Sequence, residues 1–209
     1  MNYKIIILFS LILTATSYPQ QLFIEPELGH HISLDIDEQV NSTQMIGFKL
    51  GFLNNGITWH SGFRYWESQV IDDQISSTFR TIDNSENRVF VLGIGQLVDF
   101  PNAKSGLKLS CEFVINFYKS NMNYQPMDGS TFIENIYSIT GEGNGVSIEG
   151  GYYYKLSNNI FMSAGINYLY NRVSLTRPSE IVDFDEITVP SSVSLNDVFF
   201  KISVFTILN

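Results

Sequence analysis

Apolar and polar residues alternate with a period of two along most of the chain after residue 21. Successive side chains of a β-strand point to opposite faces, so this period is typical of strands whose two faces meet different environments. One central segment shows it clearly, with Leu109 and Phe113 on one face and Ser110 and Glu112 on the other. No helical period is found beyond residue 17, and we therefore expect an all-β protein.

Eight segments carry this pattern. Pro26 lies in the first one, and because proline cannot donate a ladder hydrogen bond, we expect the regular strand to begin near Glu27. In the fourth segment both faces are apolar from Val89 to Ile94, so the sequence leaves its orientation open. The expected strands are Leu22–Ile36, Thr43–Leu53, Ile57–Val70, Arg88–Val98, Leu107–Tyr118, Gly145–Leu156, Ile160–Arg172 and Leu195–Leu208.

The connections between these segments alternate between short and long. Short turns rich in Asn, Gly or Pro follow the second, fourth and sixth segments, at residues 54–56, 99–106 and 157–159. Asn and Gly tolerate the positive φ that tight hairpins need. The other connections are polar, and the last three of them are longer: Asp37–Ser42, Ile71–Asn87, Lys119–Asn144 and Val173–Ser194.

Transmembrane barrels sort their connections in this way, with short periplasmic turns and long extracellular loops. A strand of about eleven residues, tilted by about 40°, climbs roughly 28 Å, close to the apolar band of about 25 Å. We therefore predict an eight-stranded antiparallel up-and-down transmembrane β-barrel, with both termini at the short-turn end.

The first seventeen residues have the features of a secretory signal peptide. Lys4 is followed by the apolar run Ile5–Leu13, and Ala15 and Ser17 are small residues before a cut after Ser17. The run is shorter than the roughly 20 residues that a membrane-spanning helix needs. We expect a cleaved signal peptide at residues 1–17 and one barrel domain at residues 18–209.

Composition supports an apolar outer surface. Charged residues make up 16% of the chain, below the roughly 25% typical of soluble domains. Tyr and Trp gather near the strand ends, as in an interfacial aromatic girdle. The net charge is −9 without basic clusters, which argues against nucleic-acid binding. Cys111 is the single cysteine, so no internal disulfide forms.

If the apolar face points outward, the polar face lines a narrow lumen. Six charged lumen residues lie at similar heights above the short turns, so three acids and three bases are expected to meet in mid-barrel. Buried charges of this kind must pair or cost several kcal/mol each. We interpret the cluster as a structural ion-pair plug, or alternatively as the gate of a narrow proton or ion path. Its members are Glu27, Lys49, Arg64, Glu112, Glu149 and Lys201.

With these features the chain resembles the small bacterial outer-membrane β-barrel family typified by the transmembrane domains of outer membrane proteins A and X. The resemblance covers Leu22 to Leu208 and includes the last strand, Asp197–Leu208, which is similar to the recognition strand used in barrel insertion. The chain departs from it by ending in Ile207-Leu208-Asn209, where the family usually ends in an aromatic residue. The resemblance implies the bacterial outer membrane as location and its lipid as partner; we expect a monomer.

Some barrels of this size are lipid-A acyl enzymes, which need a His, a Ser and an acid together near the membrane boundary. His60 adjoins Ser61, but neighbouring strand residues point to opposite faces, so the two cannot form a dyad. His30 and His31 lie mid-strand. We expect no enzyme and no catalytic residues.

The long loops are acidic. Asp183, Asp185 and Glu186 could bind Ca²⁺ weakly through oxygen ligands, but no calcium-loop pattern is present, and solvated acidic loops are the preferred interpretation. We expect no metal and no cofactor. The loop acids are Asp72, Asp73, Asp83, Glu86, Asp183, Asp185 and Glu186.

The expected function is that of an integral outer-membrane barrel with a structural or surface-interaction role, which presents its long loops to a partner that the sequence does not identify. The alternatives are a narrow or gated porin-like channel for ions or small solutes and a lipid-A-modifying barrel enzyme. If the faces were reversed, the chain would be a secreted soluble barrel that binds a ligand inside.

Overall fold

The computed structural model describes residues 20–32, 39–41, 43–72, 79–101, 104–126, 134–176 and 191–208. The signal peptide expected at residues 1–17 lies outside the described residues. All of the regular structure described is β-strand: β1 (Gln21–Ile32), β2 (Gln39–Asn41), β3 (Gln44–Asn54), β4 (Ile57–Asp72), β5 (Phe79–Asp99), β6 (Ser105–Pro126), β7 (Glu134–Lys155), β8 (Ile160–Thr176) and β9 (Ser192–Leu208).

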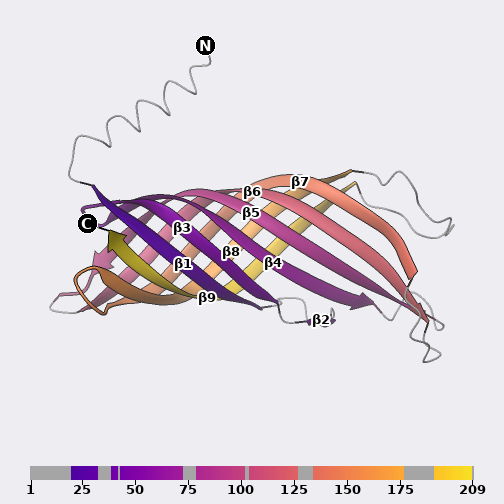
Figure 1. Cartoon of the computed structure of the whole chain (residues 1–209), viewed down its shortest axis with the longest axis horizontal. Helices are drawn as coiled ribbons and strands as arrows, with labels where there is room; N and C mark the ends of the chain where they lie inside the picture. Colours follow the sequence, from indigo (N-terminus) through magenta and orange to yellow (C-terminus); the bar gives the residue numbers. More distant parts are fainter. Residues whose placement is uncertain are drawn as a thin grey trace, which may run out of the picture.

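Eight of these strands close into a ring, and each is antiparallel to its neighbours (Figure 1). The ring is closed by β1 and β9, whose register runs from Leu22 opposite Leu208 to Ile32 opposite Val198. The short strand β2 pairs with the far end of β4. Closure gives each strand of the ring a paired neighbour on both sides, as a β-protein in lipid requires. The predicted eight-stranded up-and-down barrel is confirmed.

Tight turns join the strands at the end where β1 begins and β9 ends (Figure 1). The β3–β4 hairpin turns through Asn55 (φ 48°) and Gly56 (φ 80°), as its sequence predicts. At the other end the strands extend to different heights because they differ in length. β6 and β7 have 22 residues each, whereas β3 has 11.

The long connections expected from the sequence are shorter in the structure. β5 begins at Phe79, β6 continues to Pro126 and β7 begins at Glu134, so much of 71–87 and 119–144 is paired strand. Likewise β8 reaches Thr176. Ladder hydrogen bonds form between backbones and need no apolar side chains, so these polar extensions lack the alternation that marks a strand in the sequence.

The expectation for Pro26 is wrong. β1 begins at Gln21, and Pro26 lies inside it, opposite Phe48 of β3. The β1–β9 register skips Glu25 and Pro26 and then resumes unshifted at Glu27. The missing proline N–H therefore interrupts one side of the strand without ending it.

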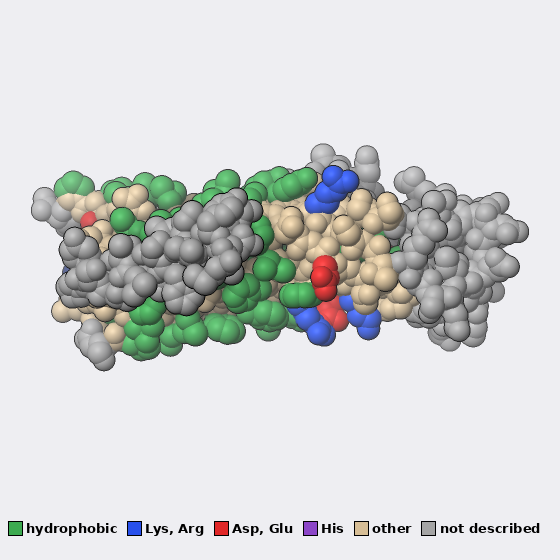
Figure 2. Space-filling view, turned by 90° about the horizontal axis from the view of Figure 1, so that it is seen from above, with side chains coloured by type: hydrophobic (Ala, Val, Ile, Leu, Met, Phe, Trp, Pro, Cys, Tyr) green, Lys and Arg blue, Asp and Glu red, His purple; other side chains and the backbone are tan. Residues whose placement is uncertain are grey.

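Large apolar side chains form a continuous belt on the outside of the barrel (Figure 2). The orientation of β5, left open by the sequence, is now defined: Val89 and Val91 are buried inside, whereas Phe90 and Leu92 are exposed outside. No helix long and apolar enough to cross a membrane occurs in the described part of the chain. Every ring strand contributes to the belt, for example Leu28, Phe48, Phe63, Leu92, Phe113, Ile148, Ile166 and Ile202.

Candidate functional site

The lumen is filled by side chains in successive layers. At the short-turn end lies an apolar layer, in which the rings of Phe23 and Phe205 stack with centroids 4.3 Å apart. Phe161 packs edge-on against both Phe205 and Tyr153. These residues come from β1, β7, β8 and β9, and the half-buried Leu53 of β3 and Leu97 of β5 pack against them, so the layer extends across the base of the barrel. The layer consists of Phe23, Tyr153, Phe161, Phe205 and Ile207.

Above this base, the structure brings together all six charged residues that the sequence places in mid-barrel. Lys49 is at their centre, with its Nζ 3.0 Å from Glu27, 2.6 Å from Glu112 and 2.9 Å from Glu149. On the other side, Lys201 Nζ lies 2.7 Å from Glu27 Oε1 and also contacts Glu149. Inward-pointing residues therefore meet in one place from five strands: β1, β3, β6, β7 and β9.

Arg64 of β4 completes the network. Its Nε donates to Glu27 Oε2 at 2.8 Å, and its Nη1 donates to Glu112 Oε2 at 2.6 Å. Nη1 also donates to Ser147, which accepts a second hydrogen bond from Asn167. The guanidinium thus spans two carboxylates in the fixed fork geometry that suits arginine.

Three further members were missed at the level of sequence: Glu25, His60 and Lys108. Lys108 contacts Glu25, and its Nζ lies 3.1 Å from Glu149 Oε1. Nε2 of His60 lies 3.1 Å from Glu112 Oε1. Glu25 precedes Pro26 and therefore the expected start of the regular first strand. Lys108 stands near the end of its strand, below the height of the other charges, although its long side chain reaches upward.

With these additions the cluster holds four carboxylates and four cationic side chains, so its formal charge is zero with His60 neutral. Glu25 also accepts a 2.5 Å hydrogen bond from Ser203, and Glu149 accepts one from Ser110. Charges removed from water are tolerated only with such complete pairing. We call these nine residues the charged layer: Glu25, Glu27, Lys49, His60, Arg64, Lys108, Glu112, Glu149 and Lys201.

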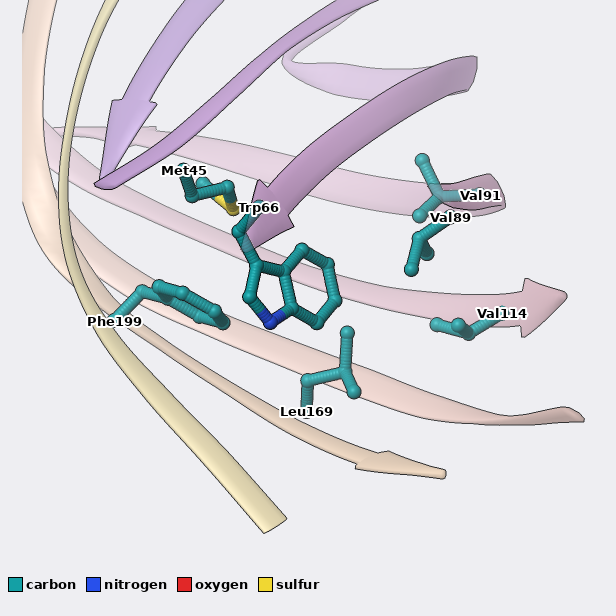
Figure 3. Packing of buried hydrophobic residues seen from close by; sticks show 7 residues of the cluster. All are labelled: Met45, Trp66, Val89, Val91, Val114, Leu169 and Phe199. Carbon is teal, nitrogen blue, oxygen red and sulfur yellow. The ribbon is translucent and has the colours of Figure 1, made fainter. Parts of the chain in front are cut away.

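A second apolar layer lies farther along the lumen than the charged layer. Figure 3 shows its side chains. The indole of Trp66 lies near its middle and packs edge-on against Phe199, with centroids 5.2 Å apart. Leu169 projects toward Trp66 from β8. Lys49, Arg64, Trp66 and Phe199 are each no more than 1% exposed. Side chains that line an open channel would be wetted, whereas these four are buried. The layer consists of Met45, Trp66, Val89, Val91, Val114, Leu169 and Phe199.

The histidines do not meet a serine in the described residues. His60 points into the charged layer, whereas Ser61 belongs to the opposite face of β4. His31 lies above the second apolar layer, with Nε2 3.0 Å from Asp197 Oδ1. His30 is exposed on the outer wall. The geometry pairs two histidines with acids but supplies no serine nucleophile to either pair.

The loop acids are dispersed. Asp83 accepts a hydrogen bond from Ser120, and Glu86 pairs with Arg88. The described residues hold no group of three His, Cys, Asp or Glu side chains that could bind a metal ion. Of Asp72 only the backbone is described. Asp73, Asp183, Asp185 and Glu186 lie outside the described residues, and so does the proposed calcium sequence.

No protein-family model matches the sequence, and no curated protein matches it. Solved structures do match. A major outer membrane protein from Thermus thermophilus is 9% identical, with a TM-score of 0.52, over 90% of this chain and 99% of that one.

Two further matches have lower TM-scores. Neisserial surface protein A is 12% identical over 91% of this chain and 100% of that one (TM-score 0.43). The N-terminal β-barrel domain of Pseudomonas aeruginosa OprF is 11% identical over 90% and 97% (TM-score 0.41). The closed ring and the apolar belt agree with the match to the Thermus protein. The chain is an eight-stranded transmembrane barrel with the fold of the small outer-membrane β-barrel proteins.

Proposed function

We propose that this protein is an integral outer-membrane barrel with a sealed lumen, and that it acts through its extracellular end as a structural or surface-interaction protein. The observation that carries the proposal is the charged layer, which is neutral, fully paired and enclosed between two apolar layers. A barrel closed in this way interacts with other molecules only through its surface. The signal peptide expected at residues 1–17 and the outer-membrane fold of its structural neighbours support export to the outer membrane.

The part of the barrel beyond the belt supports a surface role. In Figure 2 the apolar belt gives way, toward the long-strand end, to polar side chains with scattered charges. There the outward positions of β5, β6 and β7 carry Glu86, Lys119 and Glu142 instead of large apolar groups. Strands that continue past the membrane hold such residues on a rigid frame, which favours recognition of a partner.

Conductance in planar bilayers tests the proposal. We expect no unit steps from the purified barrel, nor from Glu112→Gln or Lys201→Met, because the two apolar layers remain in place. Glu86→Gln, outside the lumen, is the matched control for the effect of losing one carboxylate. Regular steps in the wild type, altered by Glu112→Gln but not by Glu86→Gln, would establish a channel and overturn the sealed barrel.

A gated channel is the second candidate, and one observation favours it. The charged layer fills the lumen with charged side chains, although apolar side chains would fill the same space. Ion pairs can exchange partners, and Lys49 already contacts three carboxylates. In that case conductance would begin only after a stimulus such as voltage. A lipid-A-modifying activity is the lesser candidate, and release of labelled acyl chains from lipid A by the purified protein is its test.

A further inference from the structure

A polar groove lies on the outer wall beside the first residues of β3, at the height where β4 continues past them. β3 begins at Gln44, whereas β4 extends to Asp72 and stays paired with β5 beyond that height. The hollow between them has a volume of about 660 Å³. This falls within the roughly 300–1,000 Å³ typical of small-molecule sites.

Two carboxylates are at the centre of the groove. Glu67 and Glu86 stand directly opposite each other in the β4–β5 register. Like charges in this position repel each other, so the pair depends on neighbouring donors. Tyr65 donates to Glu67 Oε1, and Arg88 donates to Glu86 Oε1 at 2.6 Å.

The neighbouring groups add donors and an aromatic face. Gln69 and Asn84 form the next rung, joined at 2.8 Å, and Gln44 lies at the near edge of the groove. Tyr65 is half-buried beside the carboxylates. Carboxylate oxygens accept from adjacent hydroxyls, side-chain amides donate and accept, and a tyrosine ring packs against an apolar face. A hexopyranose ring has adjacent hydroxyls for the carboxylates, oxygen and hydroxyl groups for the amides, and an apolar face for the tyrosine ring.

The charge of the groove lining and the position of the groove on the barrel restrict the class of ligand. The described lining contains no Lys or Arg, and the nearby Arg88 is already paired with Glu86, so a phosphate or other anion has no free counter-charge in the lining. Ile46, at the lower edge, belongs to the apolar belt. A ligand here therefore sits at the height where the headgroups of membrane lipids meet water.

We propose that this groove binds a neutral hexopyranose unit, supplied either by the headgroup of a glycolipid or by a free surface glycan. The carboxylates of Glu67 and Glu86 accept from its hydroxyls, and Tyr65 packs against its ring. The proposal rests on the surface role inferred above and gives that role a ligand class.

Saturation-transfer NMR with a panel of methyl hexopyranosides tests it, on the full mature chain in lauryldimethylamine oxide micelles, which contain no sugar. We expect transfer to at least one hexoside. Its affinity should fall about tenfold or more in the double variant Glu67→Gln, Glu86→Gln, because each change weakens a hydrogen bond to a charged acceptor. Glu142→Gln, at a similar height on β7 outside the groove, is the matched control and should bind like the wild type. The mobility shift on heating verifies that each variant is folded.

Nanodiscs containing a monohexosyl diacylglycerol distinguish the sources. Binding of the lipid-linked sugar alone would indicate a membrane headgroup, whereas binding of the free hexoside as well would indicate a surface glycan. The proposal is overturned if no sugar binds in either form, if the double variant binds as well as the wild type, or if Ca²⁺ alone saturates the site. Conductance without loss of sugar binding would overturn only the sealed barrel, and a sealed barrel that binds no sugar would overturn only this inference.

Discussion

Arg64 and Glu112 form a bidentate ion pair across the lumen, with Nη1–Oε2 at 2.6 Å and Nη2–Oε1 at 3.0 Å. Both side chains are fully buried. The two residues lie 48 positions apart in the chain and on strands that are not neighbours in the ring. The pair therefore braces the barrel from inside, in addition to the backbone ladder around its wall.

Replacing Arg64 by Met should destabilise the barrel strongly. The change leaves Glu27 and Glu112 with one fewer cation in a buried site, and removal of one partner of a buried pair costs about 3–5 kcal/mol. Urea unfolding in lipid vesicles, followed by the mobility shift on gels, measures the loss. The double variant Arg64→Met, Glu112→Gln removes one charge of each sign, so its loss should be clearly smaller than the sum of the single losses. If the loss in the double variant equalled the sum of the two single losses, Arg64 and Glu112 would not be energetically coupled.

The two tryptophans of the chain should report opposite environments. Trp59 is exposed in the outer belt near the short turns, whereas Trp66 is buried in the lumen. Brominated phospholipids quench only indoles that touch lipid chains. We expect Trp66→Phe to retain quenching and Trp59→Phe to lose it. The reverse result would mean that the faces of the barrel are inverted.

A charge on the belt should be costly, and its cost should depend on height. Ile148→Arg places a cation in the apolar belt, where about 2–4 kcal/mol of destabilisation is expected near the bilayer midplane. Thr140→Arg, also exposed but in the polar extension of β7, should cost less than about 1 kcal/mol. Unfolding in vesicles compares the two variants. Equal losses would show that the belt does not contact lipid.

Cys111 should resist polar thiol reagents in the folded barrel. Its side chain is exposed on the outer wall, among the apolar residues of the belt, so a charged maleimide cannot reach it through lipid. We expect no labelling in vesicles and full labelling in urea. In a Cys111→Ser background, Ser174→Cys in the polar extension should label in vesicles. Labelling of Cys111 at the same rate as that site would contradict its burial in lipid.

The sequence predicted the ring and six of the charged side chains that share its interior. Alternation assigns Lys49, Glu112 and Lys201 to one face of their strands, and short turns such as Asn55-Gly56 fix which strands are neighbours. These are local properties: strand geometry alternates the side chains, and positive φ selects the turn residues.

The contacts inside the lumen were decided by tertiary structure. Lys49 and Glu149 meet from 100 residues apart, and the stagger of the closed ring brings Lys108 into the same cluster. The polar extensions of β5 to β7 and the inward direction of Val89 and Val91 also depend on partners elsewhere in the chain. A strand on its own specifies two faces, but the height at which its side chains meet those of distant strands exists only once the sheet has closed.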